Sequence, residues 1–506
     1  MRVRTLPEIR AAGLDAWFQP ALDRLAGLHS EAEPRLREWF LPDQPLYLAR
    51  APGRLDVMGG IADYSGATVL ELPLDRATWA LLQRQAASRC DLATRRDGRW
   101  QLFGIDQRPL LAGKLRTPQA LAKWFADHDA DRWAAYVVGG VQLLFRRAGT
   151  RVEDVVPGFR LLFDSTVPEG SGVASSAALE VAAMAAVSAS LGLALSPAEL
   201  AESCRWVENH VVGAPCGIMD QMTSACGRRD RLLRLRCRPS PGTIEGHLAV
   251  PPGYRFYGID SGIRHAVSGA DYGTVRTAAF MGYRMIAGLA GLTVIQDGAR
   301  VKIEDPAWGG CLASIPPSEF SARFELRLPG RMTGAEFLAG YGGITDPVTR
   351  VEPAREYPVR QASTHPVREQ ARVERFAELL GGLGGNPDAA VNLGQLMCES
   401  HQSYGACGLA SEGTDRLVEL VTSAGPARGL FGAKITGGGS GGTVAILGTA
   451  EADAAVREIA SRYGAETGRP ALVFSESGPG AAETGVLLIE PGSPTAASPP
   501  SGTPRQ

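Results

Sequence analysis

The sequence predicts a fold in which helices and strands are mixed, and three observations support this. The chain has 506 residues, enough for two large domains or about three smaller ones. Its composition, 44% hydrophobic and 21% charged, is ordinary for a protein that folds around a substantial core. Three glycine- and serine-rich segments stand between apolar runs of strand or helix character, where a flexible linker is not normally found.

The apolar patterns predict the elements in chain order. Residues 1–45 have helical apolar spacing and are expected to form a helical extension. Short apolar runs predict strands at 46–52, 69–74, 78–82, 159–163 and 255–260, and on both sides of the loop 437–442. Longer runs predict helices at 133–145, 177–195, 200–212 and 451–463.

Composition divides the chain into a first domain over residues 46–285 and a second domain over 361–490. Between them, residues 286–360 contain several glycines and prolines and have a hydrophilic, mixed-sign character, which is typical of a junction or an insertion. Residues 491–506 are rich in proline, serine and glycine, so we expect a disordered tail.

Charge and cysteine content exclude several classes of function. With 52 basic and 54 acidic residues, the net charge of −2 provides no electrostatic reason to expect nucleic acid or an anionic membrane as partner. The eight cysteines form no Cys-x-x-Cys pair, which argues against a disulfide framework and a structural zinc site. The longest apolar run, 177–195, contains Glu180 and is rich in small residues, which favours a core helix. We expect a cytoplasmic protein that is a monomer or a weak homo-oligomer.

The three glycine- and serine-rich segments are residues 51–60, 168–178 and 437–442. In the middle one, glycines allow tight turns and serines supply hydroxyl groups, and a helical run follows directly. A loop that leads into a helix N-terminus is a site for phosphate oxygens. The spacing is not that of a P-loop, and no dinucleotide-binding fingerprint is present. Taken singly, a segment of this kind is more often a turn or a linker than a binding loop.

Together and in this order, the segments resemble the three signature motifs of the GHMP small-molecule kinases. The resemblance spans residues 46–448, and the galactokinase branch fits best. The matching runs are Ala51-Pro52-Gly53-Arg54, Asp63-Tyr64-Ser65-Gly66, Pro215 to Gln221, Ser261 to His265, and Asp271 to Arg276. It implies an α+β fold of two GHMP kinase domains, with ATP and a small sugar bound in an active site between them and Mg²⁺ as cofactor.

The resemblance also implies roles for individual residues. Asp220 would be the catalytic base, and Arg54 would offset negative charge at the transferred phosphoryl group. Ser176 and Glu208 would hold the Mg²⁺ ion. The nucleotide would contact Gly170, Gly172, Ser175, Ser176, Ala177 and Trp133, the sugar would contact Gly60, Ile61, Asp63, Gly217 and Tyr272, and Gly437, Gly438 and Gly439 would support the phosphate loop.

Several of these assignments have a structural alternative. Glu208 would otherwise lie on a solvated helix face, Asp220 would cap a helix or stabilise a turn, and Trp133 would belong to an apolar helix face. His265 and His401 are interpreted as core residues or as residues behind the site. The first serine of the family's serine triplet is Ala174 here, while the next two are kept as Ser175 and Ser176.

Two departures from the galactokinase pattern bear on the sugar. Galactokinases have Glu and His where this chain has Gly60 and Ile61, whereas the following Asp63 is kept. In that family the Glu and His bind the outer hydroxyls of galactose, including the one on C6. Their replacement by glycine and an apolar residue suits a sugar without a hydroxymethyl group. The segments 51–66 and 269–272 resemble the kinase part of plant L-arabinokinases, and L-arabinose is D-galactose without that group.

The expected reaction is therefore phosphorylation of the anomeric hydroxyl of L-arabinose by ATP. Replacing Gly60 by Glu and Ile61 by His is then expected to shift preference towards galactose. Two alternatives stay open: a galactokinase, and a non-catalytic sugar and ATP sensor. Arg54 and Asp220, both present, favour catalysis.

Overall fold

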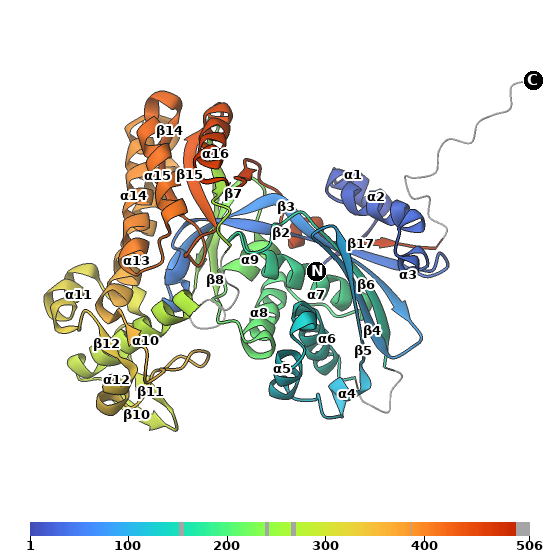
Figure 1. The fold of residues 1–506 in the computed structure, drawn as a ribbon, viewed down its shortest axis with the longest axis horizontal. Coiled ribbons are helices and arrows are strands. Elements are labelled where there is room, and N and C mark those ends of the chain that lie inside the picture. The colour runs from blue at the N-terminus through green and yellow to red at the C-terminus, as the bar shows by residue number, and fades with distance from the viewer. Residues whose placement is uncertain (151–155, 238–241, 265–269, 386, 492–506) are drawn as a thin grey trace, which may run out of the picture.

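A large mixed sheet forms the centre of the first half of the protein (Figure 1). The computed structural model describes residues 1–491 except 151–155, 238–241, 265–269 and 386. Within these residues, nine strands form one sheet in the order β1-β17-β2-β3-β6-β4-β5, with β7 paired to β3 and β8 paired to β7. They are β1 (Val3–Thr5), β2 (Leu46–Met58), β3 (Thr68–Gln85), β4 (Arg89–Arg96), β5 (Arg99–Asp106), β6 (Gly158–Ser165), β7 (Arg231–Arg236), β8 (Thr243–Ala249) and β17 (Val486–Ile489).

Helices cover both faces of this sheet, because side chains alternate along each strand. Ala49 of β2 packs into the core under the helices of one face, whereas Leu48 packs against Phe18 and Trp39 of the N-terminal extension. The first face carries α4 (Arg108–Leu111), α5 (Pro118–Ala126), α6 (Ala135–Arg147), α7 (Ser175–Ser190), α8 (Pro197–Val207) and α9 (Met219–Cys226). The extension contributes α1 (Leu6–Ala11), α2 (Gln19–Gly27) and α3 (Pro34–Arg37), which lie beside β17 in Figure 1.

A smaller sheet in the order β14-β15-β9-β16 organises the other half. Its strands are β9 (Tyr254–Asp260), β14 (Leu430–Ile435), β15 (Thr443–Thr449) and β16 (Val473–Phe474). Apolar side chains of this sheet pack against helices whose buried faces supply the rest of the core. These helices are α13 (Val359–Gly382), α14 (Pro387–Ala406), α15 (Glu412–Ala424) and α16 (Asp453–Thr467).

Residues 286–360 form a group of small elements whose apolar side chains share one cluster with α10 (Ala270–Ala290), α13, α14 and Ile61. They lie at the lower left of Figure 1. The elements are β10 (Thr293–Asp297), β11 (Arg300–Glu304), α11 (Pro317–Arg323), β12 (Met332–Thr333), α12 (Gly334–Tyr341) and β13 (Glu356–Tyr357). Here the weak sequence pattern corresponds to short hairpins and helices.

Two strands lie in a different sheet from the one that the predicted domain ranges assign them to. β9, within the first range 46–285, pairs with β15 and β16. β17, near the end of the second range 361–490, pairs with β1 and β2. The chain therefore crosses between the two sheets more than once. Packing, and not position in the chain, decides which strands pair.

Local differences from the expected elements are small. The two strands predicted at 69–74 and 78–82 are one continuous strand, β3. The helix predicted over 200–212 ends at Val207 and continues as a single π-helical turn, Glu208–Val212. The helix predicted from residue 133 begins at Ala135, after a 3₁₀ turn over Asp129–Ala134. The predicted disordered tail and His265 lie outside the described residues, apart from residue 491.

The two halves meet along β2 and β3. Leu55 and Leu72 of these strands share one apolar cluster with Phe376 of α13, Met397 of α14 and Leu447 of β15. The three glycine- and serine-rich segments converge beside this cluster, so the predicted site residues lie where the halves join.

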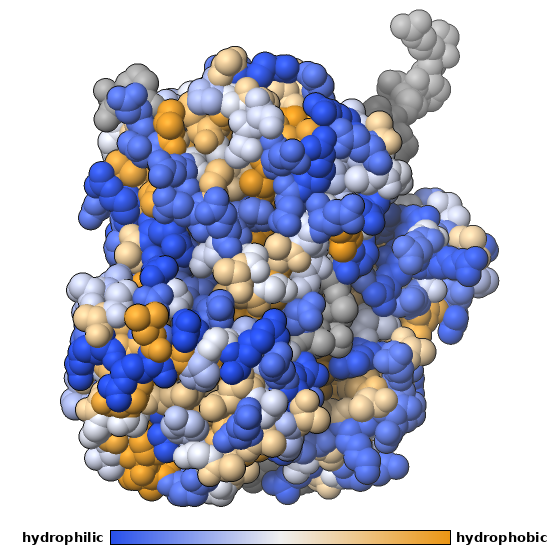
Figure 2. Space-filling model, turned by 60° about the vertical axis from the view of Figure 1, so that its left-hand side comes forward, coloured by the Kyte–Doolittle hydropathy of each residue, from blue (hydrophilic) through white to orange (hydrophobic). Residues whose placement is uncertain are grey.

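The surface shows no dominant apolar feature on the face drawn in Figure 2, where hydrophilic residues surround small groups of hydrophobic ones. Across the residues that the structure describes, no helix combines the length and apolar character needed to span a bilayer.

Candidate active site

An ion pair between Arg54 and Asp220 lies at the centre of the site. Arg54 projects from β2, and Asp220 lies in the first turn of α9. Two guanidinium nitrogens of Arg54, Nε and one terminal NH₂, are each 2.9 Å from Oδ1 of Asp220. The Arg54 side chain is 3% exposed but that of Asp220 is 24% exposed, so the carboxylate has a free side that a ligand can approach.

Arg54 stays charged in this environment. Burial opposes its charge, but the carboxylates of Asp220, Glu71 and Asp56 outweigh that effect and raise the pKa of the guanidinium. Glu71 lies 3.3 Å from Nε of Arg54 and is fully buried. The site therefore holds a fixed positive charge next to the half-open carboxylate of Asp220.

The loop before α7 is held tightly against Arg54. A guanidinium NH of Arg54 donates to the carbonyl of Gly172 at 2.5 Å, and its backbone N–H donates to the carbonyl of Val173 at 3.0 Å. Gly170 and Gly172 have positive φ, as does the non-glycine Ala174 at the start of the helix. The hydroxyl of Ser171 donates to Oδ2 of Asp260 in β9 at 2.7 Å, so the second sheet helps to fix this loop.

The N-terminus of α7 provides the predicted phosphate-binding groups. Ser175 and Ser176 open this 16-residue helix and are partly exposed. Ala177 is fully buried, so it offers a backbone N–H rather than a side chain. Free N–H groups at a helix N-terminus favour anionic oxygens. Trp133 is partly buried against the core under α6, and its predicted contact with adenine remains a prediction.

Ser176 and Glu208, predicted to hold Mg²⁺, are brought together. Ser176 lies close enough to the carboxyl of Glu208 to lower its pKa, and this carboxyl accepts from Nε2 of Gln221 at 2.6 Å. Glu208 is 6% exposed, so the alternative of a solvated helix face is wrong. Burial and the charge of Asp220 raise its pKa to about 7.

One hydroxyl and one carboxylate are hard oxygen ligands, which suits Mg²⁺ bound mainly through phosphate oxygens and water. Among the residues with described positions, no cluster of three or more His, Cys, Asp or Glu side chains forms a self-sufficient metal site.

Glu180 is a site residue that the sequence analysis missed. It lies on α7 one turn after Ser176, is fully buried, and accepts from Nε2 of Gln221 at 3.3 Å, the same amide that binds Glu208. Burial, followed by the charge of Glu208, raises the pKa of Glu180 well above its usual value. The sequence signal that could have pointed to Glu180 is its position as a single carboxylate inside a helix of small apolar residues.

The sugar-side residues surround Asp63, which lies in the 3₁₀ turn Gly60–Ser65. Its side chain is buried, and among the described residues nothing hydrogen-bonds to Oδ1. A Cβ at Gly217 would lie 1.5 Å from Oδ2 of Asp63, so only glycine fits there. Burial, then the charge of Asp220, raises the pKa of Asp63 to about 7, although Arg276 opposes the shift.

Tyr272 and Arg276 of α10 complete this side. The ring of Tyr272 meets Tyr64 edge-on at 5.7 Å between centroids. Two nitrogens of Arg276 contact the carboxylate of Asp346 at 2.8 and 2.9 Å, and both side chains are buried. Asp346 belongs to the segment 286–360, so that segment fixes a cation next to Asp63.

Gly60 and Ile61, which the resemblance places at the sugar, are both buried by other protein atoms. The side chain of Ile61 is fully buried in the cluster formed with α10 and α14. A Cβ at Gly60, where φ is +46°, would lie 1.6 Å from the hydroxyl oxygen of Tyr404. The expected exchange of this pair for Glu and His is therefore blocked by Tyr404, a residue the sequence analysis did not consider.

The late glycine loop, which is predicted to support the phosphate loop, lies in contact with it. A Cβ at Gly437 would lie 2.9 Å from the carbonyl of Gly172 and 3.0 Å from the Arg54 guanidinium, so the backbones are in close contact. Gly439 packs as closely against Leu409, while Gly438 between them is half-buried.

A buried ion pair anchors this loop, and the sequence analysis missed it. Nζ of Lys434 lies 2.7 Å from Oδ2 of Asp56, and neither side chain is exposed. The same carboxylate accepts from the N–H groups of Gly60 at 3.1 Å and Gly437 at 3.3 Å. Asp56 thus ties the first signature segment to the last.

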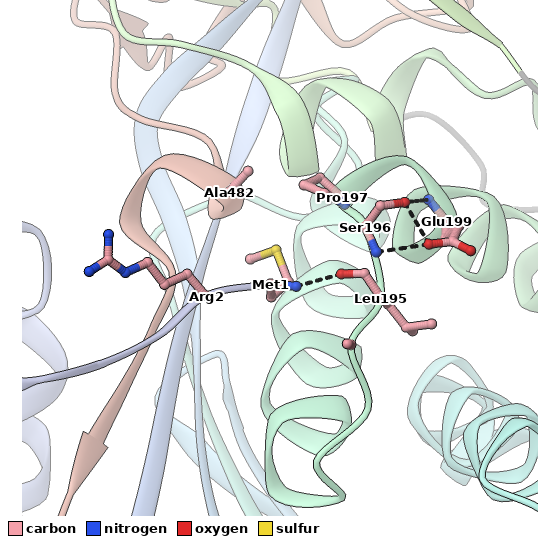
Figure 3. A pocket seen from close by; sticks show the side chains of 8 residues that line it. Met1, Arg2, Leu195, Ser196, Pro197, Glu199 and Ala482 are labelled. Atoms are coloured by element: carbon pink, nitrogen blue, oxygen red, sulfur yellow. Dashed lines mark hydrogen bonds between the residues drawn. The ribbon is translucent and has the colours of Figure 1, made fainter.

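A separate hollow lies at the N-terminus of the chain (Figure 3). Met1, Leu195, Ser196 and Glu199 line it, and the amino group of Met1 donates to the carbonyl of Leu195. It contains none of the predicted site residues, so it is not part of this site.

Comparison with known proteins identifies the family of this chain. The models for the GHMP kinases N terminal domain, the GHMP kinases C terminal and the galactokinase galactose-binding signature match residues 135–228, 388–465 and 38–84. The chain is 40% identical over 494 residues to L-arabinokinase of Arabidopsis thaliana, covering 88% of this chain and 47% of that protein. It is 30% identical over 436 residues to galactokinase of Chloroflexus aggregans, covering 85% and 92%.

The fold agrees as well. The crystal structure of Lactococcus lactis galactokinase complexed with galactose superimposes with a TM-score of 0.65 at 20% identity, over 92% of this chain and 98% of that one. The chain therefore belongs to the GHMP kinase superfamily, whose mixed α+β fold was expected. Its place is in the galactokinase branch, and it spans about half the length of the similar L-arabinokinase.

Proposed function

We propose that this protein is a sugar-1-kinase that transfers the γ-phosphoryl group of ATP to the anomeric hydroxyl of L-arabinose. One observation carries the proposal: the half-open carboxylate of Asp220 is held by Arg54 between the phosphate loop and the sugar-side residue Asp63. A sugar hydroxyl at Asp220 would lie between a proton acceptor and an anion-binding helix terminus.

In the proposed reaction, the anomeric oxygen attacks the γ-phosphorus as its proton passes to Asp220. The bond from that phosphorus to the β–γ bridging oxygen breaks, and ADP leaves. Arg54 offsets the negative charge that gathers on the transferred group. Ser176 and Glu208 would hold Mg²⁺, which supplies further positive charge to the phosphates when bound. The buried Oδ1 of Asp63, without a partner among the described residues, is suited to accept a ring hydroxyl.

Two observations favour L-arabinose as the sugar. The residue before Ile61 is Gly60, so no side chain is available there to bind an outer hydroxyl. The identity to L-arabinokinase, 40%, also exceeds the 30% to galactokinase. The match of residues 38–84 to the galactose-binding signature supports galactokinase as the second candidate. A non-catalytic sensor has less support, because the Arg54–Asp220 pair is intact.

The test is a coupled assay of ADP release with L-arabinose, D-galactose, D-galacturonate and D-xylose, using Asp220→Asn as the inactive control. The largest kcat/KM with L-arabinose, lost in Asp220→Asn, supports the proposal. Preference for D-galactose would replace it by the galactokinase alternative. Sugar binding without ADP release from any of the four would favour the sensor.

A further inference from the structure

Tyr404 of α14 occupies an unusual position between two parts of the site. Its side chain is fully buried, and its hydroxyl oxygen accepts from the N–H of Ile61 at 2.9 Å. The same hydroxyl donates to the carbonyl of Gly437 at 3.1 Å. One phenol therefore joins the turn of the first signature segment to the glycine loop of the last.

The phenol ring is held firmly in place. Nζ of Lys434 lies 5.2 Å from the ring centroid, and the ring of His365 meets it edge-on at 5.1 Å. Lys434 is itself fixed by its buried ion pair with Asp56. The hydroxyl therefore has little freedom to leave its two partners.

Gly60 shows how closely the phenol approaches the turn. The nearest atom to a Cβ at this position would be the Tyr404 hydroxyl, at 1.6 Å, followed by Oδ2 of Asp56 at 2.6 Å. No residue with a side chain fits at position 60 while Tyr404 keeps its place. The glycine that separates this chain from the galactokinase pattern is thus matched by a tyrosine from the other half.

The two joined segments serve different ends of the site. The turn Gly60–Ser65 carries Asp63, the proposed sugar contact. Gly437 is in close contact with the Gly172 carbonyl and with the guanidinium of Arg54, which lie on the phosphate side. The hydroxyl of Tyr404 therefore lies between the groups proposed to bind sugar and those proposed to bind phosphate.

We propose that Tyr404 is a positioning residue, whose hydroxyl sets the sugar-side turn relative to the phosphate-side loops. This inference rests on the proposed function, since it assigns sugar and nucleotide to those two sides. Without the hydroxyl, the N–H of Ile61 and the carbonyl of Gly437 are buried and unpaired. Because unpaired buried groups are costly, the sugar-side turn and the glycine loop then move apart. Both substrates are then affected, although Tyr404 contacts neither.

The test compares Tyr404→Phe with Tyr257→Phe. Tyr257 of β9 is equally buried, and its hydroxyl donates to the carbonyl of Thr449 at 2.7 Å, away from the site. In Tyr404→Phe, kcat/KM for the sugar and for ATP should each fall about tenfold, mainly through higher KM. In Tyr257→Phe, neither should change more than about twofold, although both variants lower the midpoint of unfolding.

The proposal would be overturned if Tyr404→Phe lowered the midpoint of unfolding without these kinetic changes. A fall in kcat/KM for only one of the two substrates would also overturn it. The assay uses whichever sugar the wild type phosphorylates, so a preference for galactose corrects the proposed function without affecting this test. If the wild type phosphorylates no sugar, hydrogen exchange decides. Amides in both 59–66 and 436–442 should then exchange faster in Tyr404→Phe but not in Tyr257→Phe, and unchanged exchange in either segment would refute the link.

Discussion

Replacing Asp63 by Asn should stabilise the ligand-free protein above neutral pH while weakening sugar binding. Asp63 is 3% exposed, and burial together with the charge of Asp220 raises its pKa from 3.8 to about 7. In the unfolded chain the same carboxyl ionises near pH 4. The folded state therefore holds a proton that the unfolded state releases, so stability falls as pH rises from about 4 to about 7.

The size of the effect follows from the two pKa values. One pH unit corresponds to about 1.4 kcal/mol, and the folded group stays protonated up to about pH 7. Between pH 5 and pH 8 the wild type should lose about 3 kcal/mol that Asp63→Asn keeps. For a chain of 506 residues that unfolds as one unit, this is about 3 °C in Tm.

Thermal unfolding of both proteins at pH 5 and pH 8, with and without sugar, measures this. Asp305→Asn is the matched control, because its carboxylate accepts from the Tyr283 hydroxyl at 2.6 Å rather than pairing with a residue next to Asp63, and its pKa is lowered. Its stabilising contribution is present above the unfolded pKa and lost only as pH falls through the lower folded value. The control should therefore be destabilised equally at both pH values. The reasoning would be refuted if the difference in Tm between Asp63→Asn and wild type did not increase from pH 5 to pH 8. It would also be refuted if sugar raised the Tm of Asp63→Asn as much as that of wild type.

Three further experiments test the chemistry. Asp220→Asn should keep its fold and its ATP affinity but lower turnover by about 10²–10⁴, and near-normal turnover would remove Asp220 from the mechanism. Glu208→Gln should raise the Mg²⁺ concentration needed for half-maximal rate, because an amide is a poorer ligand for a hard cation, and an unchanged requirement would contradict the assignment. In competition, wild type should prefer L-arabinose over D-galactose by about tenfold to a hundredfold, since a galactose hydroxymethyl would leave a hydroxyl unpaired at a cost of about 1–3 kcal/mol.

The parts of the site that could be predicted from the sequence lie in short segments with a distinctive composition. Gly170, Gly172 and Gly437 have the positive φ that only a glycine-rich loop provides without strain. Asp220 was predicted because it lies within the run Pro215 to Gln221, which resembles a known motif. The GHMP kinase fold was likewise predicted from the order of these segments, and the comparisons confirm it.

The parts that could not be predicted depend on contacts between distant segments. A strand such as β17 has the same apolar pattern whichever sheet it joins, so its pairing with β2 is decided by packing. The fully buried pair of Asp56 and Lys434 looks in sequence like two ordinary charged residues. For Glu208 a solvated helix face stayed open as an alternative, because the π-helical turn that buries it has no clear sequence signal.

These distant contacts change how the sugar preference can be altered. Gly60→Glu with Ile61→His, made alone, places a side chain where the Tyr404 hydroxyl lies 1.6 Å from the first added carbon. We therefore expect this double variant to lose activity with both sugars rather than to switch between them. A smaller residue at position 404 makes room, but it also removes the link between Ile61 and Gly437. A shift towards galactose should thus appear only in the triple variant and at reduced kcat/KM. A double variant that already prefers galactose at wild-type efficiency would show that Tyr404 does not constrain this end of the site.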